Sequence, residues 1–399
     1  MAKSTAVKFS LKIAMILGFV GFVTSFGAHI VAVNLPVYAQ QVGVGLAVIG
    51  LLIAAYDLAE VVAKPIFGAI ADKQGMKKTM LIGIALFSLA SLTYFLVDPR
   101  LLILVRFLQG VGAAALSAVS LALIGTYYVQ SRGRAYGIYN AIKGAGYVLS
   151  PVLGGLIVMK SNFGAIFLAA AAVGVIAFIL SLFLPEPEKA GGSAFDDDDD
   201  DFSLKGIITA FRDPVLWPWF VVIIVNMFFV GILFGFLPVR VYNLGYSPLA
   251  MGTLLAIPTT SYLLIQPVAG RLADQISTSL TIKVGLVLSG ISMILVPFVS
   301  GVPLALVFLV AGIGIGTVWT NTDALVSNLA KSGSLGATMG VAGSFKEIGD
   351  MAGPLIIGLV AQAFGLTTGF VACGLMGLLS LLLLAGRRNI SGLDTGEME

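Results

Sequence analysis

Long segments without a single charged residue are the feature that most limits how this chain can fold. Residues 284–322 and 351–386 contain no Asp, Glu, Lys or Arg, and each exceeds the roughly 20 residues that a helix needs to cross a bilayer. The whole chain is 58% hydrophobic and 11% charged, which leaves too few polar residues to cover a water-soluble core. The apolar runs are continuous and do not alternate, which disfavours a β-barrel. The sequence therefore predicts an all-α membrane protein.

Apolar segments recur along the chain, and we expect twelve transmembrane helices. They are predicted over residues 13–38, 45–71, 79–97, 101–127, 135–159, 162–184, 215–239, 247–270, 284–301, 304–329, 336–362 and 366–386. The first segment is too long, and is followed by too many others, for a cleaved signal peptide. We therefore interpret it as a retained span.

Basic residues in the predicted loops indicate the orientation. Sixteen Lys and Arg fall on one side of the membrane, and three fall on the other, namely Arg100, Lys160 and Arg240. Because Lys and Arg accumulate on the cytoplasmic side, we expect both termini and the middle loop to be cytoplasmic. This predicts a multi-pass protein of the plasma (cytoplasmic or inner) membrane. The net charge of +3 gives no indication of a nucleic-acid partner.

A pattern of glycine and proline occurs twice, about half a chain apart. The first copy is Gly137, Gly146, Ser150-Pro151 and Gly154-Gly155, and the second is Gly340, Gly349, Gly353-Pro354 and Gly358. The offset between the copies is 340 − 137 = 203 residues. A repeat of this length predicts two homologous halves, and in a membrane chain it suggests two halves that move about a central site. We therefore expect two pseudo-symmetric six-helix bundles, at residues 1–184 and 215–399.

The segment between the halves, residues 185–214, is predicted to be a cytoplasmic linker. It contains Pro, Gly and six consecutive aspartates, Asp196 to Asp201. Such a composition is typical of a solvated, self-repelling tether. A loose site for a divalent cation is the alternative, although nothing in the sequence fixes a coordination geometry.

Three motifs resemble those of the major facilitator superfamily. Residues 68–78 are similar to that family's loop signature, and residues 270–274 form a weaker echo of it. Residues 106–110 are similar to its fourth-span motif, and residues 137–155 resemble its fifth-span antiporter signature, with Ser150 where glycine is usual. Because the motifs lie at the expected places inside a twelve-span repeat, the resemblance covers the whole chain. The resemblance implies the twelve-helix fold of that family and is strongest to its drug/proton antiporter branch.

The loop signature is predicted to act as a gate on the cytoplasmic side. Its residues are Gly68, Asp72, Gly75, Lys77, Lys78 and, in the echo, Asp274. We expect Gly68 to let a neighbouring helix approach and Gly75 to permit a tight turn. Asp72, at a helix end, is expected to accept bonds from basic groups or from a facing helix N-terminus. The lysines also fit positive-inside anchoring, and we expect both roles.

The fifth-span signature is predicted to form a hinge or a sliding contact. Its residues are Gly137, Gly146, Pro151, Gly154 and Gly155. A proline inside a span bends the helix and frees a backbone carbonyl. Simple close packing of the glycines is the alternative interpretation.

Charged residues inside the predicted spans are costly in hydrocarbon and are usually paired or functional. We expect proton coupling at Asp57, Glu60, Arg106, Glu347 and Asp350, with Lys64, Lys143 and Lys346 as charge partners. The family resemblance places the second and eleventh spans against each other and implies a role for Arg106 near the proton path. The proton affinity of a buried carboxylate depends on nearby cations, so movement of the two halves would change it. A static lattice of ion pairs is the alternative.

Polar and aromatic residues in three spans are candidates for a substrate cavity, because the family resemblance implies that the first, fourth, seventh and tenth spans surround the substrate. The candidates are Asn34, Tyr38, Asn226, Phe229, Trp319, Asn321 and Asp323. Aromatic side chains with few polar groups suit an amphipathic ligand. Asp323 is expected either to meet a cationic drug or to pair with Lys143. The only histidine, His29, is predicted to point away from Asn34 and Tyr38 and to be a packing residue.

These features predict a proton-coupled transporter that exports small amphipathic compounds. A same-fold importer or facilitator of a polar or anionic solute is the alternative, because Arg106, Lys143 and Lys346 could bind an anion. A receptor or lipid-handling protein without transport is the alternative from another class. No nucleotide loop, metal-ligand cluster or nucleophile-base spacing stands out, so we expect no enzyme activity, no cofactor and no metal. The expected partners are the small-molecule substrate, protons and the lipid bilayer, and we expect a monomer.

Overall fold

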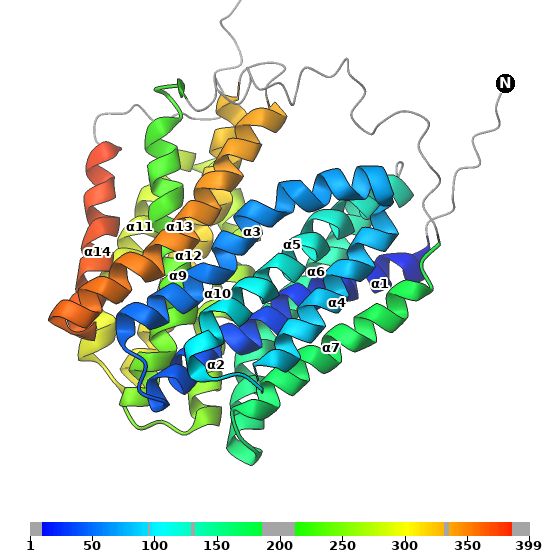
Figure 1. Cartoon of the computed structure of the whole chain (residues 1–399). Helices are drawn as coiled ribbons and strands as arrows, with labels where there is room; N and C mark the ends of the chain where they lie inside the picture. Colours follow the sequence, from blue (N-terminus) through cyan, green and yellow to red (C-terminus); the bar gives the residue numbers. More distant parts are fainter. Residues whose placement is uncertain (1–9, 95, 129–131, 186–211, 331–334, 385–399) are drawn as a thin grey trace, which may run out of the picture. The chain divides into compact units, whose positions relative to one another are not determined.

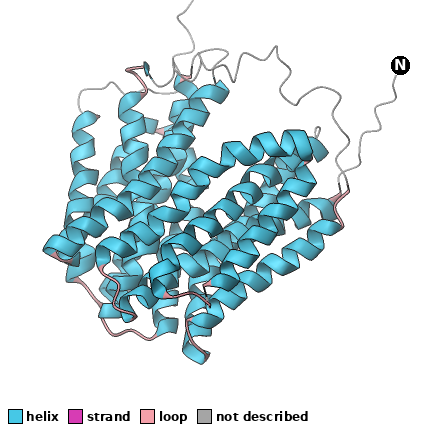
Figure 2. Ribbon diagram, viewed as in Figure 1, coloured by secondary structure: helices cyan, strands magenta, loops and turns pink. Residues whose placement is uncertain are grey.

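The structure, a computed structural model, describes residues 10–94, 96–128, 132–185, 212–330 and 335–384. Within these ranges the chain is helical and has no β-strand (Figure 2). Twelve helices in this part of the chain are long and apolar enough to cross a membrane, as predicted. The aspartates Asp196 to Asp201 lie outside the described residues.

The helices can be followed by their labels and colours in Figure 1. Their bounds are α1 Leu11–Phe22, α2 Ala28–Gln41, α3 Leu46–Gln74, α4 Met76–Thr93, α5 Leu102–Tyr127, α6 Arg132–Lys160, α7 Gly164–Leu182, α9 Trp217–Asn243, α10 Pro248–Gln275, α11 Thr278–Leu295, α12 Gly301–Leu329, α13 Leu335–Phe364 and α14 Leu366–Leu383. A π-helical turn at Val23–Gly27 joins α1 to α2, and the three segments form one span.

Several spans begin earlier than predicted, and α4 and α11 are two of them. The predicted starts at residues 79 and 284 leave nearby lysines outside the spans, whereas α4 begins at Met76 and α11 at Thr278. Lys77 and Lys283 therefore lie within the first turns of these helices. Ser277 caps α11 by accepting a hydrogen bond from the backbone nitrogen of Leu280 at 3.4 Å. A lysine near the end of a span is tolerated because its long side chain can carry the amine to water.

The chain divides into two compact units. Unit 1 lies within Met1–Tyr38, Ala55–Ala194 and Ser247–Gly252, and unit 2 lies within Ala39–Ala54, Phe195–Tyr246 and Thr253–Glu399. Each unit is therefore built mainly from one half of the sequence and takes in a short segment of the other half. The first turns of α3 belong to unit 2, and the first residues of α10 belong to unit 1.

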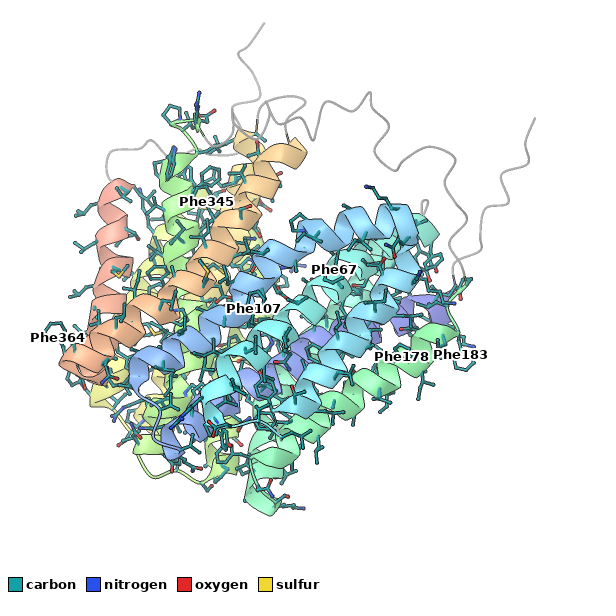
Figure 3. The ribbon with its side chains drawn as sticks, in the orientation of Figure 1. Phe67, Phe107, Phe178, Phe183, Phe345 and Phe364 are labelled. Carbon is teal, nitrogen blue, oxygen red and sulfur yellow. The ribbon has the colours of Figure 1, made fainter. Side chains whose placement is uncertain are left out.

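Large apolar side chains cover much of the exposed surface of the helices. Phe183 beyond the end of α7 is 69% exposed, and Phe364 at the end of α13 is 73% exposed (Figure 3). Other large side chains are fully buried, among them Phe87, Trp219 and Phe308. A water-soluble protein rarely exposes so many apolar side chains, whereas lipid-facing helices require them.

The internal repeat recurs in the packing of the helices. In unit 1, Gly112 of α5 faces α4, where a Cβ would lie 2.5 Å from the backbone nitrogen of Phe87. In unit 2, Gly314 of α12 faces α11, where a Cβ would lie 2.6 Å from the backbone nitrogen of Ser289. The offsets are 314 − 112 = 202 and 289 − 87 = 202 residues. The same close approach, made possible by glycine, therefore occurs once in each half of the sequence.

Candidate functional site

A buried arginine in unit 1 is held by neutral groups. Arg106 of α5 is 3% exposed, and its Nη1 donates to Oε1 of Gln109 at 2.7 Å and to the carbonyl oxygen of Ala28 at 3.4 Å. Its guanidinium carbon lies 4.2 Å from the centre of the Tyr56 ring, which is within the range of a cation–π interaction. Within the described residues its Nε–H has no acceptor. The charge of Arg106 is thus positioned without being neutralised by these partners.

Gln109 connects Arg106 to the end of α4. It lies three residues after Arg106 and so on the same face of α5, and it is completely buried. Its Nε2 donates to Oγ of Ser91 at 3.0 Å, and its Oε1 accepts from the hydroxyl of Tyr94 at 3.2 Å. Sequence reasoning assigned no role to Gln109, Ser91 or Tyr94. A glutamine one turn from an arginine on an apolar helix is the signal that could have identified the first of them.

A glycine explains why α3 comes close enough for Tyr56 to cover the arginine. A Cβ at Gly110 would overlap the carbonyl oxygen of Tyr56 and would lie 2.8 Å from Cβ of Ala59. Glycine, which has no side chain, permits this approach between helices. The predicted fourth-span motif therefore supplies both the charge, in Arg106, and the space beside it, in Gly110.

On α3, Asp57 directly follows Tyr56, and Glu60 and Lys64 lie one and two turns beyond it. Glu60 and Lys64 form the ion pair expected from their spacing, at 2.7 Å, with side chains 13% and 30% exposed. Asp57 is half-buried. Lys143 of α6 is also half-buried and lies within electrostatic range of Glu60 and Lys64. Unit 1 therefore brings together Asp57, Glu60 and their predicted partners Lys64 and Lys143.

His29 takes part in the packing of the first span. Its Nδ1 donates to the carbonyl oxygen of Ser25 at 2.8 Å, and its ring meets that of Tyr147 edge-on at 4.5 Å. Ser25 lies in the π-helical turn, where the helical hydrogen-bond pattern is interrupted, and such turns are frequent at functional sites. This turn was not predicted from the sequence, because it contains no proline and its glycine, Gly27, is a residue that transmembrane helices commonly contain.

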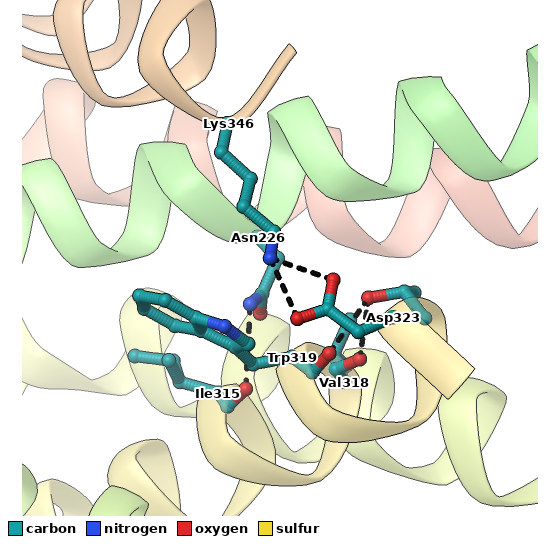
Figure 4. A network of polar contacts seen from close by, with 7 residues as sticks. Asn226, Ile315, Val318, Trp319, Asp323 and Lys346 are labelled. Atoms are coloured by element: carbon teal, nitrogen blue, oxygen red, sulfur yellow. Dashed lines mark hydrogen bonds and ion pairs between the residues drawn. The ribbon is translucent and has the colours of Figure 1, made fainter. Parts of the chain in front are cut away.

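In unit 2, a lysine, an aspartate and a tryptophan form a second cluster (Figure 4), and a tyrosine ring lies beside the tryptophan. Nζ of Lys346 on α13 lies 2.6 Å from each carboxylate oxygen of Asp323 on α12 and 5.4 Å from the centre of the Trp319 ring. The Tyr262 ring of α10 is almost parallel to that of Trp319, at 6.1 Å and 6°. The sequence analysis paired Asp323 with a ligand or with Lys143; in the structure its partner is Lys346.

Three asparagines predicted to line the cavity are buried. Asn34, Asn226 and Asn321 are each 1% exposed or less, and each amide nitrogen donates to a backbone carbonyl oxygen, that of Ile30, Ile315 and Thr317 respectively. Within the described residues the amide oxygens of all three have no donor. An unsatisfied buried acceptor is costly, so these are positions where a ligand or water could be accommodated.

Two other predicted cavity residues pack against aromatic rings or glycine. Tyr38 lies 6.0 Å from the rings of Phe163 and Phe167. Phe229 is fully buried, and its ring lies against Gly377 of α14.

A cavity of about 810 Å³ does occur in unit 1. It is lined by Leu11, Lys12, Met15, Ile16, Phe19, Ile142, Leu180 and Phe183, and none of these is a predicted cavity residue.

The loop signature fixes the ends of two helices. Gly75 has a φ of 102° and precedes α4, a conformation that favours glycine, as predicted. Nζ of Lys77 donates to the carbonyl oxygens of Leu182 and Leu184, at 3.1 and 2.6 Å. Lys77 therefore satisfies carbonyls at the end of α7 that lack helical donors.

Other parts of the predicted gate make no such contact. No atom of another helix in the described part of the chain lies within 4 Å of where a Cβ of Gly68 would be, so the close helix approach expected there is not made in this structure. Lys78 and Asp274 are exposed. The side chain of Asp72 lies outside what the structure describes.

Each unit contains a short segment from the other half of the sequence, and the hinge signature packs against that segment. In unit 1, a Cβ at Gly252 of α10 would overlap the carbonyl oxygen of Pro151 in α6. In unit 2, a Cβ at Gly50 of α3 would overlap the carbonyl oxygen of Pro354 in α13. The offsets, 252 − 50 = 202 and 354 − 151 = 203, show that these are equivalent contacts.

The remaining signature glycines make similar contacts, with one exception. Gly146 faces the π-helical turn, where a Cβ would lie 2.8 Å from the backbone nitrogen of Phe26. A Cβ at Gly154 would lie 3.0 Å from Cγ1 of Ile30, and one at Gly155 would overlap the carbonyl oxygen of Pro248. Gly137 has open space around it, so close packing does not explain it.

Ser150, where the family motif usually has glycine, compensates for the proline after it. Pro151 has no N–H, so the carbonyl of Tyr147 loses its helical donor. The hydroxyl of Ser150 donates to that carbonyl oxygen at 3.3 Å. At the equivalent position of the second copy, a Cβ at Gly353 would lie 2.8 Å from Cα of Phe228, which leaves no room for a serine.

Comparisons with known proteins agree with this architecture. The model of the Major Facilitator Superfamily matches residues 17–246 and 240–394. Among solved structures, the nucleoside transporter NupG, in a mutant form, aligns with a TM-score of 0.80 at 15% identity over 94% of this chain and 99% of that chain. A bacterial homologue of the human lysosomal transporter Spinster aligns with a TM-score of 0.78 at 15% identity over 93% of this chain and 95% of that chain. These identities support the fold alone.

Sequence relatives match only part of the chain. The quinolone resistance protein NorA of Staphylococcus aureus is 31% identical over 177 residues, which are 44% of this chain and 45% of NorA. An uncharacterized MFS-type transporter of Mycobacterium tuberculosis is 32% identical over 173 residues, which are 43% of this chain and 30% of that protein. The matches thus span less than half of these curated relatives. The family model, which spans nearly the whole sequence, shows that this chain belongs to the Major Facilitator Superfamily and is a multi-pass membrane transporter.

Proposed function

We propose that this transporter exports small amphipathic compounds in exchange for protons. The observation that carries the proposal is the polar cluster of unit 1. A buried Arg106 held by neutral partners lies over Tyr56. The acids Asp57 and Glu60 follow Tyr56 on α3. A carboxylate close to an unneutralised cation gains or loses proton affinity as their separation changes. Such a group can couple protonation to a change in conformation.

The amphipathic substrate is supported by unit 2 and by one relative. The Trp319 and Tyr262 rings, with the Asp323 carboxylate beside them, provide apolar contact area and an anionic group, as sites for amphipathic cations do. NorA, by its name a quinolone resistance protein, is similar over 44% of this chain. We propose that the protein acts in the cytoplasmic membrane with both termini in the cytoplasm, because most of its loop lysines and arginines fall on one side.

The test is substrate uptake driven by an imposed proton gradient. The full-length protein is reconstituted in liposomes with an acidic lumen, and uptake of a fluorescent organic cation is followed from outside. Antiport predicts accumulation in the lumen, and this accumulation is abolished when a protonophore removes the gradient. Accumulation only when the exterior is acidic would instead support an importer that moves substrate and protons together.

An importer of anionic solutes is the second candidate, because one observation favours it. Arg106 is buried with no acid among its hydrogen-bond partners, and a guanidinium in that state can bind carboxylate or phosphate. Uptake of a radiolabelled organic anion that is lost in Arg106→Gln, with no transport of organic cations, would select this candidate over the exporter.

A further inference from the structure

The ammonium group of Lys346 occupies a place that would suit a cationic ligand. It lies between the carboxylate of Asp323, at 2.6 Å, and the face of the Trp319 ring, at 5.4 Å (Figure 4). A carboxylate combined with an aromatic face is an arrangement that binds ammonium ions, including those of organic ligands. In this structure the protein's own amine fills the position.

The pair of Lys346 and Asp323 is open to exchange. The side chains are 22% and 30% exposed, and Trp319 is half-buried. A partly exposed ion pair is easier to separate than a fully buried one, because its partners are less completely removed from solvent. Lys346 can also leave without moving the helix, because its charge sits at the end of a flexible four-carbon chain. An incoming cation would therefore replace one positive charge with another at Asp323.

The aromatic part of the site is rigid, in contrast to the lysine. A Cβ at Gly316 of α12 would overlap the carbonyl oxygen of Tyr262 and lie 2.6 Å from Cγ2 of Ile265 on α10. A Cβ at Gly312 would overlap the carbonyl oxygen of Pro258. These two glycines, four residues apart, let α10 and α12 pack closely, which places Tyr262 parallel to Trp319 at 6.1 Å. A fixed aromatic surface reduces the entropy lost when a ligand binds.

We propose that Asp323 and Trp319 form a binding site for a hydrophobic organic monocation and that Lys346 is its internal competitor. The proposal rests on the proposed function, because it specifies the substrate class that such an exporter would bind. Lys346 holds the site closed to weakly binding cations and to simple inorganic ones. A hydrophobic cation displaces it, because the apolar body of that ligand gains contact with the rings as well as the carboxylate. Anions of the same shape gain nothing from Asp323.

The experiment measures equilibrium binding to the full-length protein in lipid nanodiscs, without a gradient. The probe is tetraphenylphosphonium, and tetraphenylborate, an anion of nearly the same shape, is the control ligand. Lys346→Met removes the competitor and keeps the length of the side chain, so we expect the Kd for tetraphenylphosphonium to fall at least about tenfold, which corresponds to about 1.4 kcal/mol. Lys346→Arg retains the competing charge and should bind as the wild type does.

Two further variants separate a specific site from a general change in charge. In the double variant Asp323→Asn with Lys346→Met, the tenfold gain should disappear, and in Trp319→Leu with Lys346→Met it should be reduced. Binding of tetraphenylborate should not improve in any variant. A Lys346→Met protein that binds the phosphonium no better than the wild type overturns the proposal, as does a gain that persists without Asp323. Thermal unfolding of each variant verifies that it is folded. Lys346→Arg keeps the positive charge, so its unchanged Kd would show that the gain in Lys346→Met comes from loss of that charge.

The binding experiment and the test of proton-driven transport can fail independently of each other. If binding follows the expected pattern but no proton-driven flux is found, the site stands and antiport fails. If proton-driven flux occurs but binding does not depend on Lys346 and Asp323, antiport stands and the site is wrong.

Discussion

Arg106 shows at the residue scale how a charge can be kept inside an apolar helix bundle. Its hydrogen bonds go to an amide and a backbone carbonyl, and its plane is covered by an aromatic ring. A buried charge is costly unless it is hydrogen-bonded, and the neutral acceptors of Nη1 supply such bonds without cancelling the charge. The residue therefore remains a source of positive potential for nearby acids.

The role of Gln109 can be tested with a near-isosteric change. Gln109→Leu removes the acceptor of Arg106 and Tyr94 and leaves a buried guanidinium without its shortest hydrogen bond. We expect a loss of about 2 kcal/mol or more, seen as a drop of several degrees in the unfolding temperature in detergent. Gln109→Glu retains an acceptor and should lose less. Equal stability of the wild type and Gln109→Leu would show that the network does not support the fold.

Asp57 is the acid for which we expect the clearest effect on coupling. Asp57→Asn keeps the shape and hydrogen-bonding capacity but cannot ionise, so substrate should still bind while proton-driven accumulation in liposomes is lost. Asp98→Asn is the control, since Asp98 caps a turn between α4 and α5. Proton-driven accumulation in Asp57→Asn at the wild-type rate would remove Asp57 from the mechanism.

At the scale of the helices, glycines determine how closely neighbours pack. Gly112 and Gly314 face backbone atoms of α4 and α11, where no flexible side chain can move aside. We expect Gly112→Ala and Gly314→Ala each to destabilise the protein by about 1–3 kcal/mol. Gly343→Ala in α13 is the control, because open space surrounds it and alanine favours a helix by up to about 1 kcal/mol. Calorimetry measures the unfolding temperature of the three variants. Equal shifts in all three would contradict the proposed importance of close packing at Gly112 and Gly314.

Lys77 provides a second test at this scale. Lys77→Met removes the donor to the carbonyl oxygens of Leu182 and Leu184, at a cost of about 1 kcal/mol. We expect faster hydrogen exchange at the end of α7, with the rest of unit 1 unchanged. Lys78→Met alters the same charge at an exposed position and should leave that exchange rate as it is. Identical exchange in both variants would assign Lys77 to membrane orientation alone.

The sequence predicted the helices better than it predicted their contacts. Apolar length alone gave all twelve spans, because a bilayer requires about 20 apolar residues for each one. The ion pair of Glu60 and Lys64 followed from helical spacing within α3. The pairing of Asp323 with Lys346 did not, because it depends on which faces of α12 and α13 meet. The π-helical turn at Val23–Gly27 was missed for a similar reason, since its Thr and Ser residues also occur in ordinary helices.

At the scale of the whole molecule, the repeat links sequence to mechanism. Glycine and proline positions about 202 or 203 residues apart make equivalent contacts in the two units, as at Gly252 with Pro151 and Gly50 with Pro354. Two structurally equivalent halves are the basis of alternating access in transporters of this kind. The two-bundle fold could be predicted from the sequence for this reason, whereas the family was predicted from its motifs. The residues that bind substrate depend on side-chain directions that a repeat does not specify.

The central claim, that substrate and protons move in opposite directions, is tested most directly by proton movement driven by substrate alone. Liposomes containing the protein are prepared with equal pH on both sides and a pH-sensitive dye in the lumen, and an outward gradient of an organic cation is then imposed. The account predicts acidification of the lumen as protons enter in exchange for the departing cation, and no change in Asp57→Asn. Alkalinisation of the lumen, or cation efflux with no change in pH, would contradict it.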